Sequence, residues 1–256
     1  MNLLLSNDDG IHAPGLAALE AGLSELGPCW TLAPAQEASA GSHALSLHRP
    51  LRVEPAGERR FAVDGSPADC VYLGLQHFLP HPPDVVVCGI NRGANVSLDV
   101  YYSGTVAAAR EAAMWGLPAL SVSLFTAGGG ASGELHWDSA VHFARRVTTE
   151  IVQRGLGFEG LLNLNIPNLP LEDIRGLRVA RLGRRHWSRV VDARQDIKAR
   201  PYYWLGGHHL GFEPIPDSDG PCVQQGWATL TPLRLDCTHE GALDALASWN
   251  AVRQER

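Results

Sequence analysis

Two adjacent carboxylates, Asp8 and Asp9, follow the apolar stretch Leu3-Leu4-Leu5 near the start of the chain. Neighbouring carboxylates repel each other, so keeping both ionised costs free energy unless a cation or several hydrogen-bond donors offset the repulsion. A hard divalent metal does this most directly. The alternative is structural, because the sequence Asn-Asp-Asp-Gly at residues 7–10 is rich in turn formers and would also suit a turn before the next helix.

A second polar group follows the β-branched run at residues 84–88, which predicts a central parallel strand. Asn91 comes directly after this run, as Asp8 and Asp9 follow the first strand. Open α/β sheets bind ligands beyond the carboxyl ends of their strands, and an amide oxygen is an acceptable ligand for a hard cation. The competing interpretation of Asn91 is a turn residue in the left-handed conformation.

The polar loop at residues 36–43 is expected to leave the sheet at the same edge. It contains Ser39, Ser42 and His43, each of which can face the site. Serine and glycine are also what any surface loop contains, and a lone histidine is more often a loop or core residue than a ligand.

Ser103-Gly104-Thr105 joins a turn to a run of strong helix formers at residues 106–111. Free amide groups, two hydroxyls and the positive end of a helix together suit an anion such as phosphate, and Gly104 allows close approach of the backbone. Helix capping alone would also explain Ser103 and Thr105.

The elements that must position these residues alternate between strand and helix, which predicts an α/β fold. A leucine periodicity predicts a helix over residues 14–26, and a Ser-Pro start at residues 66–67 predicts another. Further elements are expected at 29–33 (strand), 51–63 (hairpin), 117–124 (strand), 137–154 (helix), 161–166 (strand), 227–233 (strand) and 241–253 (amphipathic helix).

The character of the chain changes after about residue 170. We therefore expect a catalytic core over residues 1–170 and a C-terminal oligomerisation region over residues 171–256 that is not an independent domain. This region is rich in arginine up to Arg194, and a cluster of aromatic residues follows at Tyr202-Tyr203-Trp204. Exposed strands of this type more often pair with another subunit than bind nucleic acid.

Composition narrows the function classes. The 256 residues carry a formal net charge of -6, which argues against a general nucleic-acid binder. Lys198 is the only lysine, so phosphate binding of the Walker type is excluded. Five scattered cysteines form no metal or disulfide pattern, no apolar run approaches a membrane span, and a cytoplasmic enzyme is the simplest expectation.

Taken together, several motifs resemble the SurE family, also called survival protein E, of metal-dependent 5′/3′-nucleotidases. The resemblance covers nearly the whole chain in the family's order. Its motifs are Asn7-Asp8-Asp9-Gly10, Gly65-Ser66-Pro67-Ala68-Asp69-Cys70-Val71, Gly89-Ile90-Asn91-Arg92-Gly93-Ala94-Asn95, Tyr102-Ser103-Gly104-Thr105-Val106-Ala107-Ala108, Leu162-Asn163-Leu164-Asn165-Ile166-Pro167, Arg200-Pro201-Tyr202-Tyr203-Trp204 and Thr229-Leu230-Thr231-Pro232-Leu233.

The resemblance implies a role for each matching residue. By this resemblance, the ligands of one divalent metal ion per subunit are Asp8, Asp9, Ser39 and Asn91. The residues that it implies for phosphate binding are Asn95, Ser103, Gly104 and Thr105. It also implies a Rossmann-like, mostly parallel sheet core, a projecting C-terminal hairpin, and a terminal helix exchanged between the subunits of a homodimer or homotetramer. The chain departs from the usual family pattern at residues 38–41, around Ser39.

The expected reaction is hydrolysis of a nucleoside monophosphate to nucleoside and phosphate. An oxygen-only ligand set favours Mg²⁺ or Mn²⁺ over zinc. Asp8 or Asp9 would take a proton from the attacking water or would itself attack phosphorus, and the sequence leaves both routes open. Activity on polyphosphate is also left open, and the alternative function is a non-catalytic nucleotide sensor.

Overall fold

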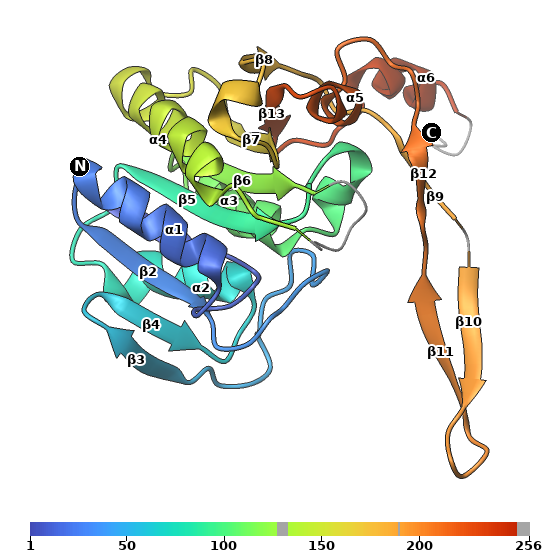
Figure 1. The fold of residues 1–256 in the computed structure, drawn as a ribbon, viewed down its shortest axis with the longest axis horizontal. Coiled ribbons are helices and arrows are strands. Elements are labelled where there is room, and N and C mark those ends of the chain that lie inside the picture. Colours follow the sequence, from blue (N-terminus) through green and yellow to red (C-terminus); the bar gives the residue numbers. More distant parts are fainter. Residues whose placement is uncertain (127–132, 189, 250–256) are drawn as a thin grey trace, which may run out of the picture.

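The computed structural model describes residues 1–126, 133–188 and 190–249. These residues form a nine-stranded sheet covered by helices on both faces, and a long two-stranded arm projects away from this body (Figure 1). The strand order is β3-β4-β2-β1-β5-β6-β7-β13-β8. Among the described strands of this sheet, the β3–β4 and β7–β13 pairs are antiparallel and the other pairs are parallel.

The bounds of the elements follow the chain. The strands of the large sheet are β1 (Leu3–Ser6), β2 (Cys29–Pro34), β3 (Val53–Gly57), β4 (Arg60–Val63), β5 (Val85–Arg92), β6 (Ala119–Phe125), β7 (Gly160–Pro167), β8 (Leu177–Val179) and β13 (Ala228–Arg234). The helices are α1 (Pro14–Leu23), α2 (Pro67–Leu73), α3 (Gly104–Met114), α4 (Trp137–Arg154), α5 (Asp219–Gln224) and α6 (Leu243–Ala247). Short turns of helix lie at η1 (Ser24–Leu26), η2 (Gly74–Phe78), η3 (Ser97–Tyr101), η4 (Leu171–Asp173) and η5 (Glu240–Ala242).

Strand β1 lies near the middle of the sheet and is fully buried, which explains its continuous apolar sequence. Leu3 and Leu5 point to one face, where they join the core formed with α1 and α4. Leu4 points to the opposite face, where it joins the core formed with α2 and α3. Side chains that alternate along one strand thus fasten both helical layers to the strand that ends at Asp8.

The predicted α/β class and mostly parallel sheet are confirmed. Helix α4 matches the predicted range of 137–154. The strand predicted at 84–88 is longer than expected, because β5 continues to Arg92 after a shift in its register with β6 between Cys88 and Asn91. Asn91 therefore lies inside the strand, opposite Ser123, rather than in a turn beyond it.

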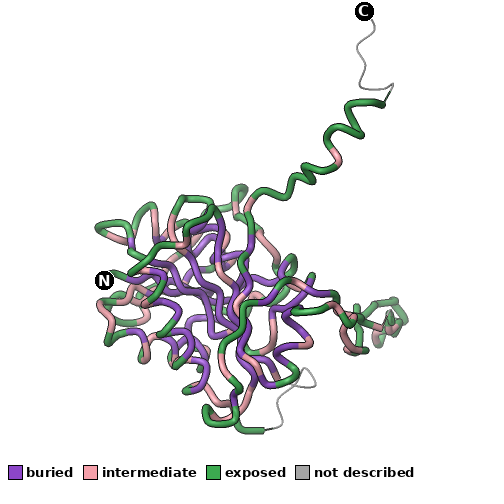
Figure 2. Tube along the Cα trace, turned by 90° about the horizontal axis from the view of Figure 1, so that it is seen from above, coloured by how far each residue is buried: buried purple, intermediate pink, exposed green. Residues whose placement is uncertain are grey.

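The C-terminal part of the chain adds strands to the large sheet and also forms the projecting arm. Strands β8 and β13 extend the large sheet. The arm is the antiparallel pair β10 (Val190–Gln195) and β11 (Pro201–Gly206), and its base is the antiparallel pair β9 (Arg185–Trp187) and β12 (His209–Phe212). The described part of the predicted terminal helix, η5 and α6, extends away from the body (Figure 2), and residues 250–256 lie outside the described residues.

The cysteines at positions 29, 70, 88, 222 and 237 are free thiols. Within the three described ranges, no helix is both long and apolar enough to cross a membrane.

The start of α1 packs so closely on β5 that a small side chain would not fit. A methyl group at Gly15 would lie 2.1 Å from the carbonyl oxygen of Ile90, next to Asn91. We predict that Gly15→Ala lowers the free energy of unfolding by about 1–3 kcal/mol, because the helix must move away from the strand. Chemical denaturation measures this. Gly133→Ala, which adds a methyl group in open space, is the control, and an equal midpoint shift in both variants would contradict the prediction.

Candidate active site

A cleft of about 1120 Å³ lies beyond the carboxyl end of β1 and alongside the end of β5. Most of the predicted site residues line it, although they come from distant parts of the chain. The predicted residues that line the cleft are Asp8, Asp9, Ser39, Asn91, Asn95 and Ser103. Gly104 and Thr105 lie behind this surface and are buried, and Ser42 and His43 are not among the lining residues.

Asp8 is 4% exposed and lies against the first turn of α3. The backbone N–H of Thr105 donates to Asp8 Oδ2 at 3.1 Å, and the Thr105 hydroxyl donates to Asp8 Oδ1. Gly104 permits this approach, because a Cβ there would lie 2.8 Å from the Cβ of Asp8. Burial raises the pKa of Asp8, whereas these hydrogen bonds and the positive end of the helix favour its ionised form.

Asp9 is more exposed than Asp8 and accepts a hydrogen bond from the backbone N–H of Arg92, at 3.2 Å to Oδ2. Burial and the neighbouring charge of Asp8 raise the pKa of Asp9 to about 6. Keeping both carboxylates ionised at neutral pH therefore costs electrostatic free energy. A bound cation removes that cost, so the structure of this pair fits a metal site.

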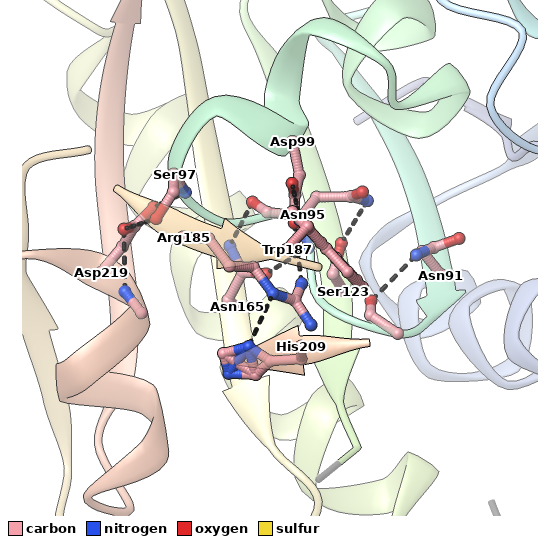
Figure 3. A network of polar contacts seen from close by, with 12 residues as sticks. Asn91, Asn95, Ser97, Asp99, Ser123, Asn165, Arg185, Trp187, His209 and Asp219 are labelled. Carbon is pink, nitrogen blue, oxygen red and sulfur yellow. Dashed lines mark hydrogen bonds and ion pairs between the residues drawn. The ribbon is translucent and has the colours of Figure 1, made fainter. Parts of the chain in front are cut away.

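Two neutral oxygens complete the predicted ligand set. The side-chain nitrogen of Asn91 donates to the carbonyl oxygen of Gly93 at 2.9 Å, which leaves the amide oxygen of Asn91 for another partner (Figure 3). Ser39 is exposed in its loop and donates to Glu37 at 2.8 Å. The described residues contain no group of three His, Cys, Asp or Glu side chains suited to a metal, so a metal here depends on these neutral oxygens. An all-oxygen set fits Mg²⁺ or Mn²⁺.

The loop that carries Ser39 is anchored to the turn before α3 and to α3 itself. Ser42 donates its backbone N–H to the carbonyl oxygen of Tyr102 at 3.1 Å. The His43 Nε2 pairs with the buried carboxylate of Glu111 on α3 at 2.7 Å. These two residues thus position the loop; the sequence had left open whether they face the site, and neither lines the cleft.

Asn95 is held by a buried network that the sequence did not predict. Its backbone N–H donates to Asn165 Oδ1 at 2.9 Å, and its carbonyl oxygen accepts from Asn163 and Asn165 at 2.8 and 3.1 Å. Its side-chain nitrogen donates to Ser123 at 2.8 Å (Figure 3). The signal available in the sequence was a pair of asparagines two residues apart, which lie on one face of β7.

Known proteins resemble this chain over almost its full length. The sequence profile of the family described as Survival protein SurE matches residues 3–189. This chain belongs to the SurE family. A relative from Citrifermentans bemidjiense, named 5′-nucleotidase SurE, is 43% identical over 97% of this chain and 99% of its own length. One of the same name from Anaeromyxobacter sp. strain Fw109-5 is 47% identical over 100% of this chain and 98% of its own length.

A solved structure agrees with the fold. The crystal structure of the SurE protein from Aquifex aeolicus is 33% identical, has a TM-score of 0.85, and covers 96% of this chain and 98% of its own. Membership of this nucleotidase family implies a divalent metal. The roles of the individual residues remain predictions, and for Thr105 the structure provides a contact with Asp8 that any role in phosphate binding must accommodate.

The raised pKa of Asp9 predicts a pH-dependent stability in the metal-free protein. The pKa of Asp9 rises from 3.8 to about 6 on folding. At pH values between these two, the folded protein therefore binds more protons than the unfolded chain. Stability should therefore fall as the pH rises from about 4 to about 6. We predict that Asp9→Asn stabilises the metal-free protein at pH 8 by roughly 1–2 kcal/mol, after allowance for solvent screening, and much less at pH 4.

Chemical denaturation in excess chelator at the two pH values tests this prediction. Asp244→Asn, at an exposed position on α6, is the control and should have little effect at either pH. An equal effect of Asp9→Asn at pH 4 and pH 8 would show that the charge of Asp9 is not the cause.

The contact between Thr105 and Asp8 makes a separate prediction about metal affinity. Thr105→Val removes the hydroxyl that donates to Asp8 and keeps the shape of the side chain, whereas Thr105→Ser keeps the hydroxyl. Because a hydrogen bond to a charged group contributes roughly 1.5–3 kcal/mol, we expect Mn²⁺ to bind Thr105→Val at least about tenfold more weakly and Thr105→Ser nearly normally. Calorimetric titration measures both. Unchanged Mn²⁺ affinity in Thr105→Val would leave phosphate binding as the role of this residue.

Proposed function

We propose that this protein is a divalent-metal-dependent nucleotidase that hydrolyses nucleoside monophosphates to nucleoside and inorganic phosphate. The observation that carries the proposal is the Asp8–Asp9 pair at the edge of a large cleft: burial raises both pKa values, and the charge of Asp8 raises that of Asp9 further. The names of the relatives support the substrate class. Hydrolysis of 3′-nucleotides and of short polyphosphate belongs to the same proposed chemistry.

The proposed metal ligands are Asp8, Asp9, Asn91 and Ser39, which would hold one Mg²⁺ or Mn²⁺ ion per subunit. A bound ion supplies Lewis-acid activation of a phosphate oxygen and lowers the pKa of a water molecule. Asp8 is fixed in orientation, because both of its oxygens accept hydrogen bonds from Thr105. Asp9 is the more exposed carboxylate, which suits it to contact water or substrate as a general base or as a nucleophile.

The proposed phosphate-binding residues gather at the start of α3. Ser103 is the N-cap of this helix and lines the cleft, and its Oγ accepts a hydrogen bond from the backbone N–H of Val106 at 3.1 Å. Asn95 lines the same cleft and is held there by its hydrogen bond to Asn165 on β7. Gly104 and Thr105 contribute the first turn of the helix, whose positive end stabilises an anion as well as Asp8.

Assembly into a homodimer or homotetramer is a further part of the proposal, with residues 171–256 as the oligomerisation region and the terminal helix exchanged between subunits. Exposed apolar side chains support it. Val191 on the arm is 58% exposed and Trp249 after α6 is 60% exposed, so both present apolar surface that a second subunit would cover.

Release of inorganic phosphate from 5′-AMP, with and without chelator, tests the proposed activity. We expect Asp8→Asn and Asp9→Asn each to lower kcat/KM by about a hundredfold or more, because loss of a ligand should cost at least as much as loss of its supporting contacts. Asp64→Asn, which changes a carboxylate outside the cleft, is the control. Thermal melting confirms that each variant is folded.

Two outcomes would contradict the proposal. Undiminished phosphate release in excess chelator would exclude metal-dependent hydrolysis. Metal-dependent binding of 5′-AMP without release of phosphate would favour a non-catalytic nucleotide sensor.

A further inference from the structure

The base of the arm forms a second wall of the cleft, which the proposed metal and phosphate sites do not use. This wall consists of Trp187 and Ser188 at the end of β9 and residues 205–207 at the end of β11. Pockets of about 300–1,000 Å³ hold whole small-molecule ligands. A cleft of about 1120 Å³ therefore has room for far more of a substrate than its phosphate group.

Trp187 is held in a defined orientation by two charged side chains. Its indole Nε1 donates to Asp99 Oδ1 at 3.2 Å, and the guanidinium of Arg185 lies over its ring, 4.1 Å from the centroid (Figure 3). Arg185 in turn pairs with Asp99 Oδ2 at 2.7 Å. Despite these contacts Trp187 is 44% exposed and lines the cleft, so part of a rigid aromatic surface remains open to a ligand.

The same contacts connect Trp187 to the proposed phosphate site. Asp99 belongs to η3, and its carbonyl oxygen accepts from the backbone N–H groups of Tyr102 and Ser103 at 2.9 and 3.1 Å. One residue thus anchors both the indole ring and the turn that opens α3. The separation between the aromatic wall and the start of α3 is set by a short chain of direct contacts.

The two walls of the cleft differ in charge. Around the proposed metal site the cleft is lined by the carboxylates Asp8, Asp9 and Glu37 and by the single cation Arg92 among its described lining residues. Around Trp187 the charge of Arg185 is offset by Asp99, and the pKa of His209, which accepts a hydrogen bond from Arg185 at 3.4 Å, is lowered by burial and by the charge of Arg185. His209 is therefore neutral at neutral pH. An acidic wall suits a metal-bound phosphate, and a neutral aromatic wall suits an uncharged planar group.

We infer that Trp187 is the surface on which the nucleobase of the substrate stacks, with Asp99 and Arg185 as the residues that orient it. This inference rests on the proposed function and adds a base-binding subsite to it. Stacking on an aromatic side chain tolerates every base, because each base has a π-face. The subsite therefore favours nucleotides over phosphomonoesters that lack a base, with little selection among the bases themselves.

The comparison of 5′-AMP with ribose 5-phosphate tests the inference, because the two share the reacting phosphate and sugar and differ in the base. In Trp187→Ala we expect KM for 5′-AMP to rise about five- to hundredfold with kcat retained, and kcat/KM for ribose 5-phosphate to change less than about twofold. Trp187→Phe should keep most of the affinity for 5′-AMP.

Trp115→Ala is a matched control. Trp115 is 47% exposed and donates its indole Nε1 to the carboxylate of Glu111 at 2.9 Å, yet it is not among the residues that line the cleft. This variant should leave KM for both substrates unchanged. Equal losses on both substrates in Trp187→Ala, or an unchanged KM for 5′-AMP, would overturn the inference.

Calorimetric binding of the same two compounds in the presence of Mn²⁺ separates this inference from the proposed function. If the wild-type protein releases phosphate from neither compound, the proposed function fails, and the binding data still decide the role of Trp187. Tighter binding of 5′-AMP than of ribose 5-phosphate, lost in Trp187→Ala, supports the base subsite. Equal binding of the two compounds by the wild-type protein overturns it.

Discussion

The repulsion between Asp8 and Asp9 is the physical constraint that the contacts at the carboxyl end of β1 must accommodate. Both carboxylates follow a strand that is buried on both faces, so neither can be fully hydrated. The first turn of α3 donates two hydrogen bonds to Asp8, and β5 donates one backbone N–H to Asp9. These donors hold the pair in place, but they leave both pKa values raised. A bound cation would remove the remaining electrostatic cost, which is why the pair fits the proposed metal site.

A second set of buried contacts fixes Asn95, which lines the same cleft. Asn163 and Asn165 on β7 use three side-chain hydrogen bonds to fix the backbone of Asn95. These groups are buried, where an unpaired amide would be costly, so the network has little freedom to adopt another arrangement. The polar edge of the sheet therefore has a fixed geometry. Another part of the cleft is lined by residues of the arm and its base.

Much of the site could be predicted from local patterns. The run Leu3-Leu4-Leu5 followed by two carboxylates indicated a buried strand that ends in a polar site, and the structure places Asp8 and Asp9 in the cleft. The helix over residues 137–154 was also predictable, because its apolar residues recur at helical spacing. The continuation of β5 through Asn91 was not, because a register shift depends on pairing with β6, a strand about thirty residues further along the chain.

The division between the two kinds of information follows from the range of the interactions involved. Periodicity, capping residues and composition act over a few residues, and they determined by themselves the α/β class, the order of the elements and the residue types at the proposed metal site. Only the tertiary structure decided which groups meet. It placed Thr105 against Asp8, joined Asn95 to β7, and brought Trp187 against Asp99 in the same cleft as the carboxylates. These contacts join residues about 70 to 100 positions apart, and no local propensity encodes a pairing over that distance.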